Sequence, residues 1–252
     1  MEFILGLVGA CIGIVIAFVI IVAIIYYKIQ NFVGKENMKE LVEVAKEAKD
    51  IEKQEYSRQK SIGGITNLIE PEIIRDFGDF NKDFLFSKVE KNLRTIFSAL
   101  EDKTTEGVRN DKDLIYMRSV VEDKINDMRG SGRTVRYDDV KFHNHAIKSY
   151  KKSKGRATIT VSSTVEYYYD TNEKKFNPQY KNIKKNTRYT TEYVYVYDES
   201  AFDYNATNFT VTCPNCGAGI EFFGAGNCKY CGTYIEPINL KNWFMVSYKE
   251  DY

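Results

Sequence analysis

The sequence predicts an α+β fold, in which helices pack on one face of an antiparallel sheet. Between residues 72 and 128, apolar residues return at three- and four-residue intervals, which is typical of helices. After residue 132, segments rich in Thr, Val and Tyr alternate between apolar and polar positions, which indicates strands. Two CxxC pairs near the C-terminus indicate a small ribbon closed by a metal ion.

The composition fits a soluble body on one membrane anchor. The chain has 252 residues with 36 basic and 35 acidic side chains, and its formal charge of +1 excludes a strongly basic nucleic-acid packer. Hydrophobic residues make up 43% of the chain, which is enough for a packed core. Outside one apolar segment the sequence is polar, and this excludes a transporter with several membrane spans.

Residues 1–28 are predicted to form a transmembrane anchor. Residues 3–27 carry no charge, and as a helix they would be about 37 Å long, enough to cross a hydrocarbon core of about 30 Å. Lys28, Lys35 and Lys39 follow this segment, whereas no Lys or Arg precedes it. The positive-inside rule therefore places the body in the cytoplasm and the N-terminus outside. We expect a single-pass protein of the cell membrane.

Residues 29–64 are predicted to form a stalk or linker helix. Its apolar spacing runs from Leu41 to Ile51, but Glu55 takes the next position, so a stable coiled coil is not expected. The anchor offers another route to a homo-oligomer, because small residues at short spacings let two helices approach closely. Three glycines have this spacing: Gly6, Gly9 and Gly13.

The soluble domain is expected over residues 65–252. One long helix is predicted from Glu72 to Leu100 and a second from Asp111 to Met128, where the following glycines end it. Strands are predicted from the alternating segments at 140–145, 157–169, 187–197 and 243–248.

The last four cysteines predict a metal site. Cys213-Pro-Asn-Cys216-Gly and Cys228-Lys-Tyr-Cys231-Gly are two CxxCG turns, and two such turns facing each other give a closed tetrahedral set of thiolates. We therefore expect Cys213, Cys216, Cys228 and Cys231 to bind a structural Zn²⁺ ion. Iron is an alternative, although nothing else indicates electron transfer. Disulfides are disfavoured because the cytosolic side is reducing.

The ribbon is expected over residues 211–237, inserted before the last strand. Its small strands are predicted at 221–223 and 233–235. The fifth cysteine, Cys11, lies in the predicted anchor, where it serves as a small apolar residue.

The sequence resembles the Tim-44-like domain in its membrane-anchored, zinc-ribbon-bearing bacterial form. The resemblance spans residues 65–252 and is carried by Phe80-Asn-Lys-Asp-Phe84-Leu85, Val89, Leu93, Phe97, Asp113-Leu114-Ile-Tyr-Met117-Arg118, the two CxxCG turns and Trp243-Phe-Met-Val-Ser. It implies a fold similar to nuclear transport factor 2, with cone-like helices on a curved sheet and a hydrophobic pocket. In mitochondria this domain docks the import motor to the membrane, but the present chain has its own anchor and lacks a long chaperone-recruiting region.

The expected function is binding rather than catalysis. The resemblance implies an adaptor in protein transport or envelope maintenance, which contacts membrane lipid and a protein partner or client. A lipid-binding module and a nuclear-transport-factor-2-like enzyme are the alternatives. No nucleophile elbow, P-loop or dinucleotide-binding motif appears in the sequence, so no catalytic or cofactor-binding residue is assigned.

Four polar residues are candidates for a functional site. His143 and His145 are two residues apart, so they are expected on one face of a strand, as ordinary strand positions unless carboxylates lie beside them. Glu166 and Asp170 are expected to be surface charges.

Charge is concentrated between residues 148 and 188. This segment has 11 basic and 3 acidic residues, a local net charge of 11 − 3 = +8. The favoured interpretation is that these lysines prevent the edge of the sheet from pairing with the sheets of neighbouring molecules. Contact with anionic lipid is the second interpretation. Nucleic acid, stacked on Tyr167–Tyr169, is the least favoured.

Overall fold

The fold is described by a computed structural model that defines residues 18–28, 35–153, 155–198, 211–213, 215–220, 226–235 and 241–251. The chain divides into two compact units, Met1–Glu55 and Tyr56–Tyr252. In the first unit, residues 18–28 are helical, and helix α2 spans Lys35–Ser57, so that its last two residues belong to the second unit. None of the helices in these ranges is long and apolar enough to span a membrane. Most of the predicted anchor, residues 1–17, lies outside the described residues, so the anchor stays a prediction.

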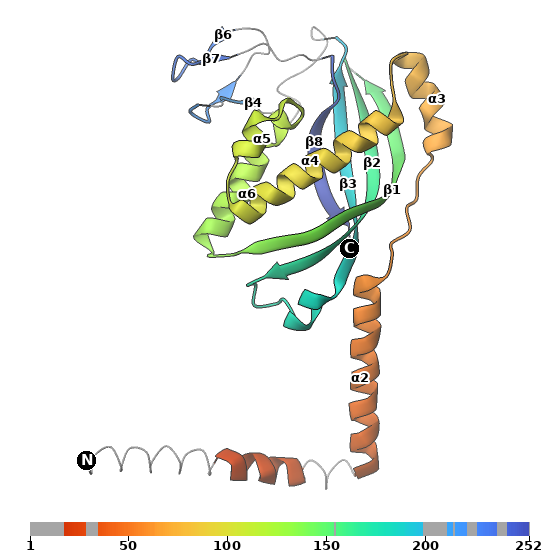
Figure 1. The fold of residues 1–252 in the computed structure, drawn as a ribbon, viewed down its shortest axis with the longest axis vertical. Coiled ribbons are helices and arrows are strands. Elements are labelled where there is room, and N and C mark those ends of the chain that lie inside the picture. The colour runs from red at the N-terminus through yellow and green to blue at the C-terminus, as the bar shows by residue number, and fades with distance from the viewer. Residues whose placement is uncertain are drawn as a thin grey trace, which may run out of the picture. The chain divides into compact units, whose positions relative to one another are not determined.

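The second unit is built on a four-stranded antiparallel sheet of order β1-β2-β3-β8 (Figure 1). Its strands are β1 (Val135–Ser153), β2 (Arg156–Thr171), β3 (Lys184–Val196) and β8 (Phe244–Asp251). The predicted α+β class and its antiparallel sheet are confirmed. Threonine, valine and tyrosine dominate β2 and β3 because branched and aromatic side chains suit a pleated surface.

Helices cover one face of this sheet (Figure 1). After α3 (Thr66–Asp76), the long helix α4 (Lys82–Asp102) crosses the strands. It is followed by α5 (Glu106–Asn110), the 3-10 helix η1 (Lys112–Met117) and α6 (Arg118–Gly130). A further 3-10 helix, η2 (Pro178–Asn182), lies between β2 and β3.

The prediction of one helix from Glu72 to Leu100 is wrong, because the chain breaks between α3 and α4. The backbone is extended at Phe77, whose N–H still bonds to the Ile73 carbonyl. Asn81 then begins α4, with its side chain accepting a hydrogen bond from the Phe84 N–H. An Asn at this position satisfies a free N–H of the first turn, so it starts a new helix rather than continuing the old one.

The core lies between α4 and the inward face of the strands. Residues of α4 at helical spacing, from Leu85 to Leu100, are buried against the odd-numbered residues of β2 and β3. Aromatic rings fill the centre: Phe97 stacks on Tyr137 with centroids 4.6 Å apart and also contacts Tyr167. Phe84 is an exception among the predicted core residues, because its side chain is 66% exposed.

Candidate metal centre

The ribbon consists of two short hairpins that carry two cysteines each. Strand β4 (Val211–Thr212) pairs with β5 (Gly219–Ile220), and β6 (Gly226–Asn227) pairs with β7 (Tyr234–Ile235). The predicted strand at 233–235 contains β7. The one predicted at 221–223 lies outside the described residues.

Both hairpins turn in the same way. In the first, the Cys213 N–H donates to the Ala218 carbonyl at 2.8 Å, and the Gly217 N–H donates back to the Cys213 carbonyl at 2.9 Å. The second hairpin repeats the two bonds at 2.9 Å each. Gly217 and Gly232 both have φ = +73°, a left-handed conformation that costs glycine little. The glycine after each CxxC is therefore required by the turn.

The turns bring the four sulfur atoms around one point. All four Sγ atoms lie within 4.8 Å of one another. Cys213 Sγ is 3.6 Å from Cys231 Sγ, and Cys216 Sγ is 3.7 Å from Cys228 Sγ. A tetrahedral site with metal–sulfur bonds of about 2.3 Å has sulfur atoms about 3.8 Å apart. A disulfide needs about 2.05 Å, so the four thiols are free and close enough to hold a metal ion.

The electrostatics of the cluster favour a bound cation. Hydrogen bonds from the Thr233 hydroxyl and N–H lower the pKa of Cys231 to about 5. The N–H groups of Cys231 and Tyr230 lower the pKa of Cys228. The N–H of Ala218 favours the thiolate of Cys216 too, but hydrogen bonds shared with the other thiols outweigh it and raise its pKa to about 12. Four thiolates at this spacing repel each other unless a positive ion lies between them.

Burial is uneven within the cluster. Cys213 and Cys228, the first cysteine of each turn, are buried, whereas Cys216 and Cys231 are exposed. Four thiolates saturate a tetrahedral ion and leave no position for a substrate, so the set suits a structural ion rather than a catalytic one.

The ribbon is attached to the helical layer at both ends. Strand β4 packs against η1 and α6. Where the chain returns, the buried Lys88 of α4 donates from Nζ to Asn242 Oδ1 at 2.8 Å, to the Trp243 carbonyl at 3.2 Å and to Asp113 Oδ1 at 3.1 Å. Asn242 Nδ2 also donates to Asp113 Oδ1 at 2.9 Å. We call these four residues the Lys88 latch. Sequence reasoning missed it, although a lysine directly before Val89 on the apolar face of a helix was a usable signal.

The two histidines lie on opposite faces of β1, contrary to the prediction. A β-bulge between Phe142 and Asn144 shifts the register, so residues two apart no longer share a face. His143 Nε2 lies 3.4 Å from Glu166 Oε2 on the outer face. His145 faces the helices, stacked on Phe86 with centroids 5.2 Å apart. The four-cysteine cluster is the only potential metal-binding group within the described ranges, and neither histidine belongs to it.

His145 joins three elements. Its Nδ1 lies 2.8 Å from Ser163 Oγ of β2, and its Nε2 lies 3.0 Å from Glu90 Oε1 of α4. A serine, a histidine and a carboxylate in contact invite comparison with a nucleophilic triad. Ser163 is completely buried, however, so no substrate reaches its hydroxyl. The arrangement therefore ties β1, β2 and α4 together.

Ion pairs neutralise much of the basic segment. Lys184 Nζ lies 2.6 Å from Glu166 Oε1 and 2.9 Å from Asp139 Oδ2, and these bonds raise the pKa of the lysine. Asp170 pairs with Lys181 at 2.6 Å. The expected surface carboxylates are therefore partners of the lysines. Four further acids from outside the segment pair with its basic residues: Asp76, Asp139, Glu250 and Asp251. They place four negative charges beside the segment, whereas Arg133, also from outside it, pairs with Glu173.

Comparison with known proteins adds no family to this picture. No family model matches the sequence, and no curated protein matches it.

Proposed function

We propose that the protein is a binding module, tethered to the cytoplasmic side of a membrane, whose C-terminal ribbon is closed by one structural zinc ion. The observation that carries the zinc site of this proposal is the closed set of four cysteine sulfurs within 4.8 Å of one another. Zinc is favoured over iron because four thiolates in two CxxCG turns are the usual ligands of structural zinc. Such a site stabilises a fold and leaves no position for chemistry.

The role of the ion follows from the length of the segment between β3 and β8 that it closes. Strand β3 ends at Val196 and β8 begins at Phe244, so residues 197–243 separate two paired strands. Closing a long flexible loop costs entropy, and a metal ion removes part of this cost by fixing two points inside it. The Lys88 latch then receives the chain as it returns. We propose that zinc and latch together hold β8 at the edge of the sheet.

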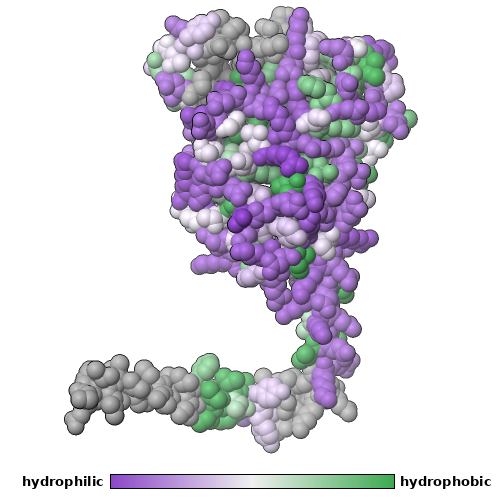
Figure 2. Space-filling model, viewed as in Figure 1, coloured by the Kyte–Doolittle hydropathy of each residue, from purple (hydrophilic) through white to green (hydrophobic). Residues whose placement is uncertain are grey.

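The filled interior supports a binding role over the two alternatives. A lipid carrier needs an apolar cavity, and an enzyme needs polar groups in an accessible pocket. Here rings of Phe97, Tyr137 and Tyr167 occupy the centre of the domain. The described hollows of about 330 and 400 Å³ both include Arg136 and Asp170 in their lining, and a third, of about 490 Å³, has Leu68, Phe86 and His145 in its lining. Hydrophilic residues predominate on the face of the molecule that Figure 2 shows.

The uncharged segment at residues 3–27 supports the tether, and the lysines after it support the cytoplasmic orientation. The order of helices, three long strands, ribbon and last strand supports a Tim-44-like assignment, which we propose on these grounds. Protein transport or envelope maintenance is the corresponding proposed setting.

Metal analysis of the purified full-length chain tests the zinc proposal. We expect about one zinc ion per chain and no stoichiometric iron. A chain that holds no metal after purification under reducing conditions would refute the structural ion.

Photocrosslinking in cells tests the binding role. Two exposed apolar side chains, Leu68 at 78% and Phe84 at 66%, are suitable probe positions, with the exposed Lys174 as a control. We expect one protein adduct of the same mass from both apolar positions and none from the control. Lipid adducts alone would replace the adaptor with the lipid-binding alternative.

A further inference from the structure

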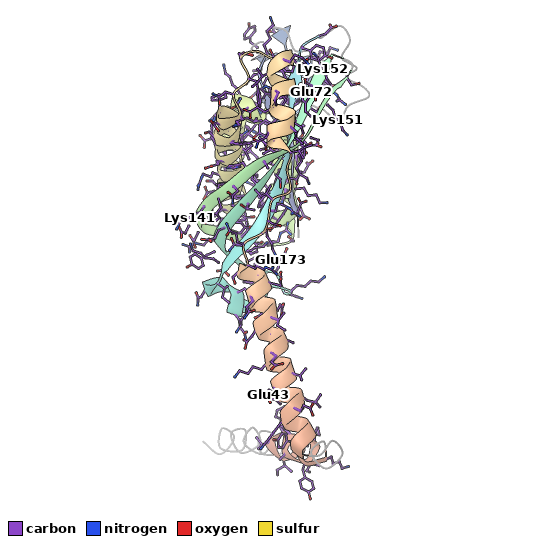
Figure 3. The ribbon with its side chains drawn as sticks, turned by 90° about the vertical axis from the view of Figure 1, so that its right-hand side faces the viewer. Glu43, Glu72, Lys141, Lys151, Lys152 and Glu173 are labelled. Atoms are coloured by element: carbon purple, nitrogen blue, oxygen red, sulfur yellow. The ribbon has the colours of Figure 1, made fainter. Side chains whose placement is uncertain are left out.

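The second hairpin of the ribbon depends on the first for its position. The first hairpin is attached to the helical layer through β4, whereas no packing of that extent joins β6 or β7 to another described element. Figure 1 shows the ribbon at one end of the domain, and Figure 3 labels Lys151 and Lys152 of β1 at the same end. Contacts between the two hairpins, at the cysteines and beside them, therefore hold the second hairpin in place.

One side-chain bridge joins the two hairpins without using a metal ion. Asn215, which lies between the cysteines of the first turn, donates from Nδ2 to Thr233 Oγ1 of the second hairpin at 2.9 Å. The same hydroxyl oxygen lies 3.3 Å from Cys231 Sγ. A hydroxyl group accepts one hydrogen bond and donates another, whereas a thiolate only accepts. The proton of Thr233 therefore goes to the thiolate of Cys231, while its oxygen accepts from Asn215.

The bridge has no counterpart on the other side of the cluster, although the two turns share their main-chain geometry. The position equivalent to Thr233 in the first turn is Ala218, which has no hydroxyl group. The position equivalent to Asn215 in the second turn is Tyr230, which is 77% exposed. The sequence therefore allows this bridge on one side of the cluster only, at Cys231.

The cysteine that receives the bridge is one of the two exposed ligands. A hydrogen bond to a metal-bound thiolate orients the sulfur and offsets part of its negative charge, and loss of such an outer contact costs about 10–100-fold in metal affinity. The bond between Asn215 and Thr233 is itself exposed, so water competes with it. We therefore expect an effect at the lower end of this range.

We propose that Thr233 and Asn215 are positioning residues of the metal centre: Thr233 holds the Cys231 sulfur in place for the ion, and Asn215 orients the Thr233 hydroxyl from the opposite hairpin. The proposal deepens the proposed zinc site and rests on it for the identity of the ion. Neither residue binds the metal, because both act through Cys231. In this way the first hairpin, which β4 anchors, fixes a ligand on the second.

Competition between the full-length chain, in detergent micelles, and a chromogenic zinc chelator measures the effect on affinity. Thr233→Val removes the hydroxyl group but keeps the branched shape, so zinc affinity should fall about tenfold. Thr233→Ser keeps the hydroxyl group and should bind zinc within about threefold of wild type. Wild-type affinity in Thr233→Val, or a Thr233→Ser variant as weak as Thr233→Val, would overturn the proposal.

A second pair of variants tests the direction of the bridge. Asn215→Ala should weaken zinc binding less than Thr233→Val does, because the Thr233 hydroxyl still donates to the sulfur. Tyr230→Ala, at the equivalent position of the second turn, is the matched control and should leave the affinity unchanged. Equal losses in Asn215→Ala and Tyr230→Ala would trace the effect to loosening of the turns and reject the bridge.

Cobalt(II) bound in place of zinc reports on the sulfur directly. The sulfur-to-cobalt charge-transfer absorption should move to lower energy in Thr233→Val, because the sulfur lone pairs are no longer stabilised by a hydrogen bond, and should return in Thr233→Ser. An unshifted band in Thr233→Val would mean that the hydroxyl only joins the hairpins. A wild-type chain without zinc would reject the ion itself, whereas one zinc ion per chain with equal affinity in every variant would keep the ion and reject the positioning residues.

Discussion

Lys88 of α4 and Asn242, which follows it by 154 residues, are joined by a hydrogen bond of 2.8 Å. The contact connects the helical layer to the point where the chain returns from the ribbon. Trp243 follows directly and packs on Phe77, with ring centroids 5.5 Å apart. A buried ammonium is costly unless all its hydrogen bonds are made, and here the carbonyl, amide and carboxylate oxygens of the latch accept them.

Replacement of Lys88 by Met should destabilise the domain by about 3 kcal/mol, because it leaves Asp113 buried without its main cation. The side chain of Asp113 is 15% exposed and that of Lys88 is 5% exposed. Water therefore solvates the Asp113 carboxylate too little to replace the lost ammonium group. Urea unfolding of the full-length chain, followed by the fluorescence of its single tryptophan, Trp243, measures this effect.

Lys91→Met is the matched control, three residues further along α4. Lys91 also forms ion pairs, with Asp111 at 2.8 Å and with Asp113 at the longer distance of 3.8 Å, but its side chain is 59% exposed. Pairs of this kind contribute about 0–1 kcal/mol. An equal loss of unfolding free energy in the two variants would show that burial of the Lys88 latch does not contribute to stability.

The double change Cys213→Ser, Cys216→Ser should remove the metal and loosen β8 more than β2. Strand β8 is at the edge of the sheet and pairs only with β3, whereas β2 lies between two strands. We expect metal content to fall to background and amide exchange in β8 to accelerate, with β2 nearly unchanged. Cys11→Ser is the control and should keep the ion. Metal retained by the double variant would contradict the assigned ligands.

Local patterns were enough to predict the α+β class, the antiparallel sheet and the close approach of the four cysteines. Each depends on short-range spacing, such as the alternation in β2 or the two CxxCG turns. The break at Phe77–Asn81 was missed because apolar residues continue through it at helical spacing. A helix cap at Asn81 outweighed the pattern, and a cap depends on one side-chain bond rather than on periodicity.

Long-range contacts were not predictable from the sequence. The β-bulge that places His143 and His145 on opposite faces depends on pairing with β2. The Lys88 latch depends on a contact across 154 residues.

Substitution of His145 by Ala should cost about 2–3 kcal/mol, because it removes two hydrogen bonds and the ring that packs on Phe86. His143→Ala is the matched control, on the outer face of the same strand, and should cost under about 1 kcal/mol. The urea unfolding midpoints of the two variants at neutral pH measure these two losses of stability. A larger effect from His143 would contradict the assignment of the two faces.

Glu166 should make the stability of the sheet sensitive to acid. The hydrogen bond from Lys184, with a smaller contribution from His143, lowers the pKa of Glu166 below its ordinary value of 4.5. A carboxyl group with a lowered folded-state pKa stabilises the protein fully above its unfolded-state value, and this stability is lost as pH falls through the lowered pKa. Glu166→Gln removes the charge at every pH. The variant should therefore unfold at lower urea than wild type at pH 7, and the gap between their midpoints should close as the pH falls through the lowered pKa of Glu166. A gap that stays constant from neutral to acidic pH would mean that Glu166 contributes through packing and not through its charge.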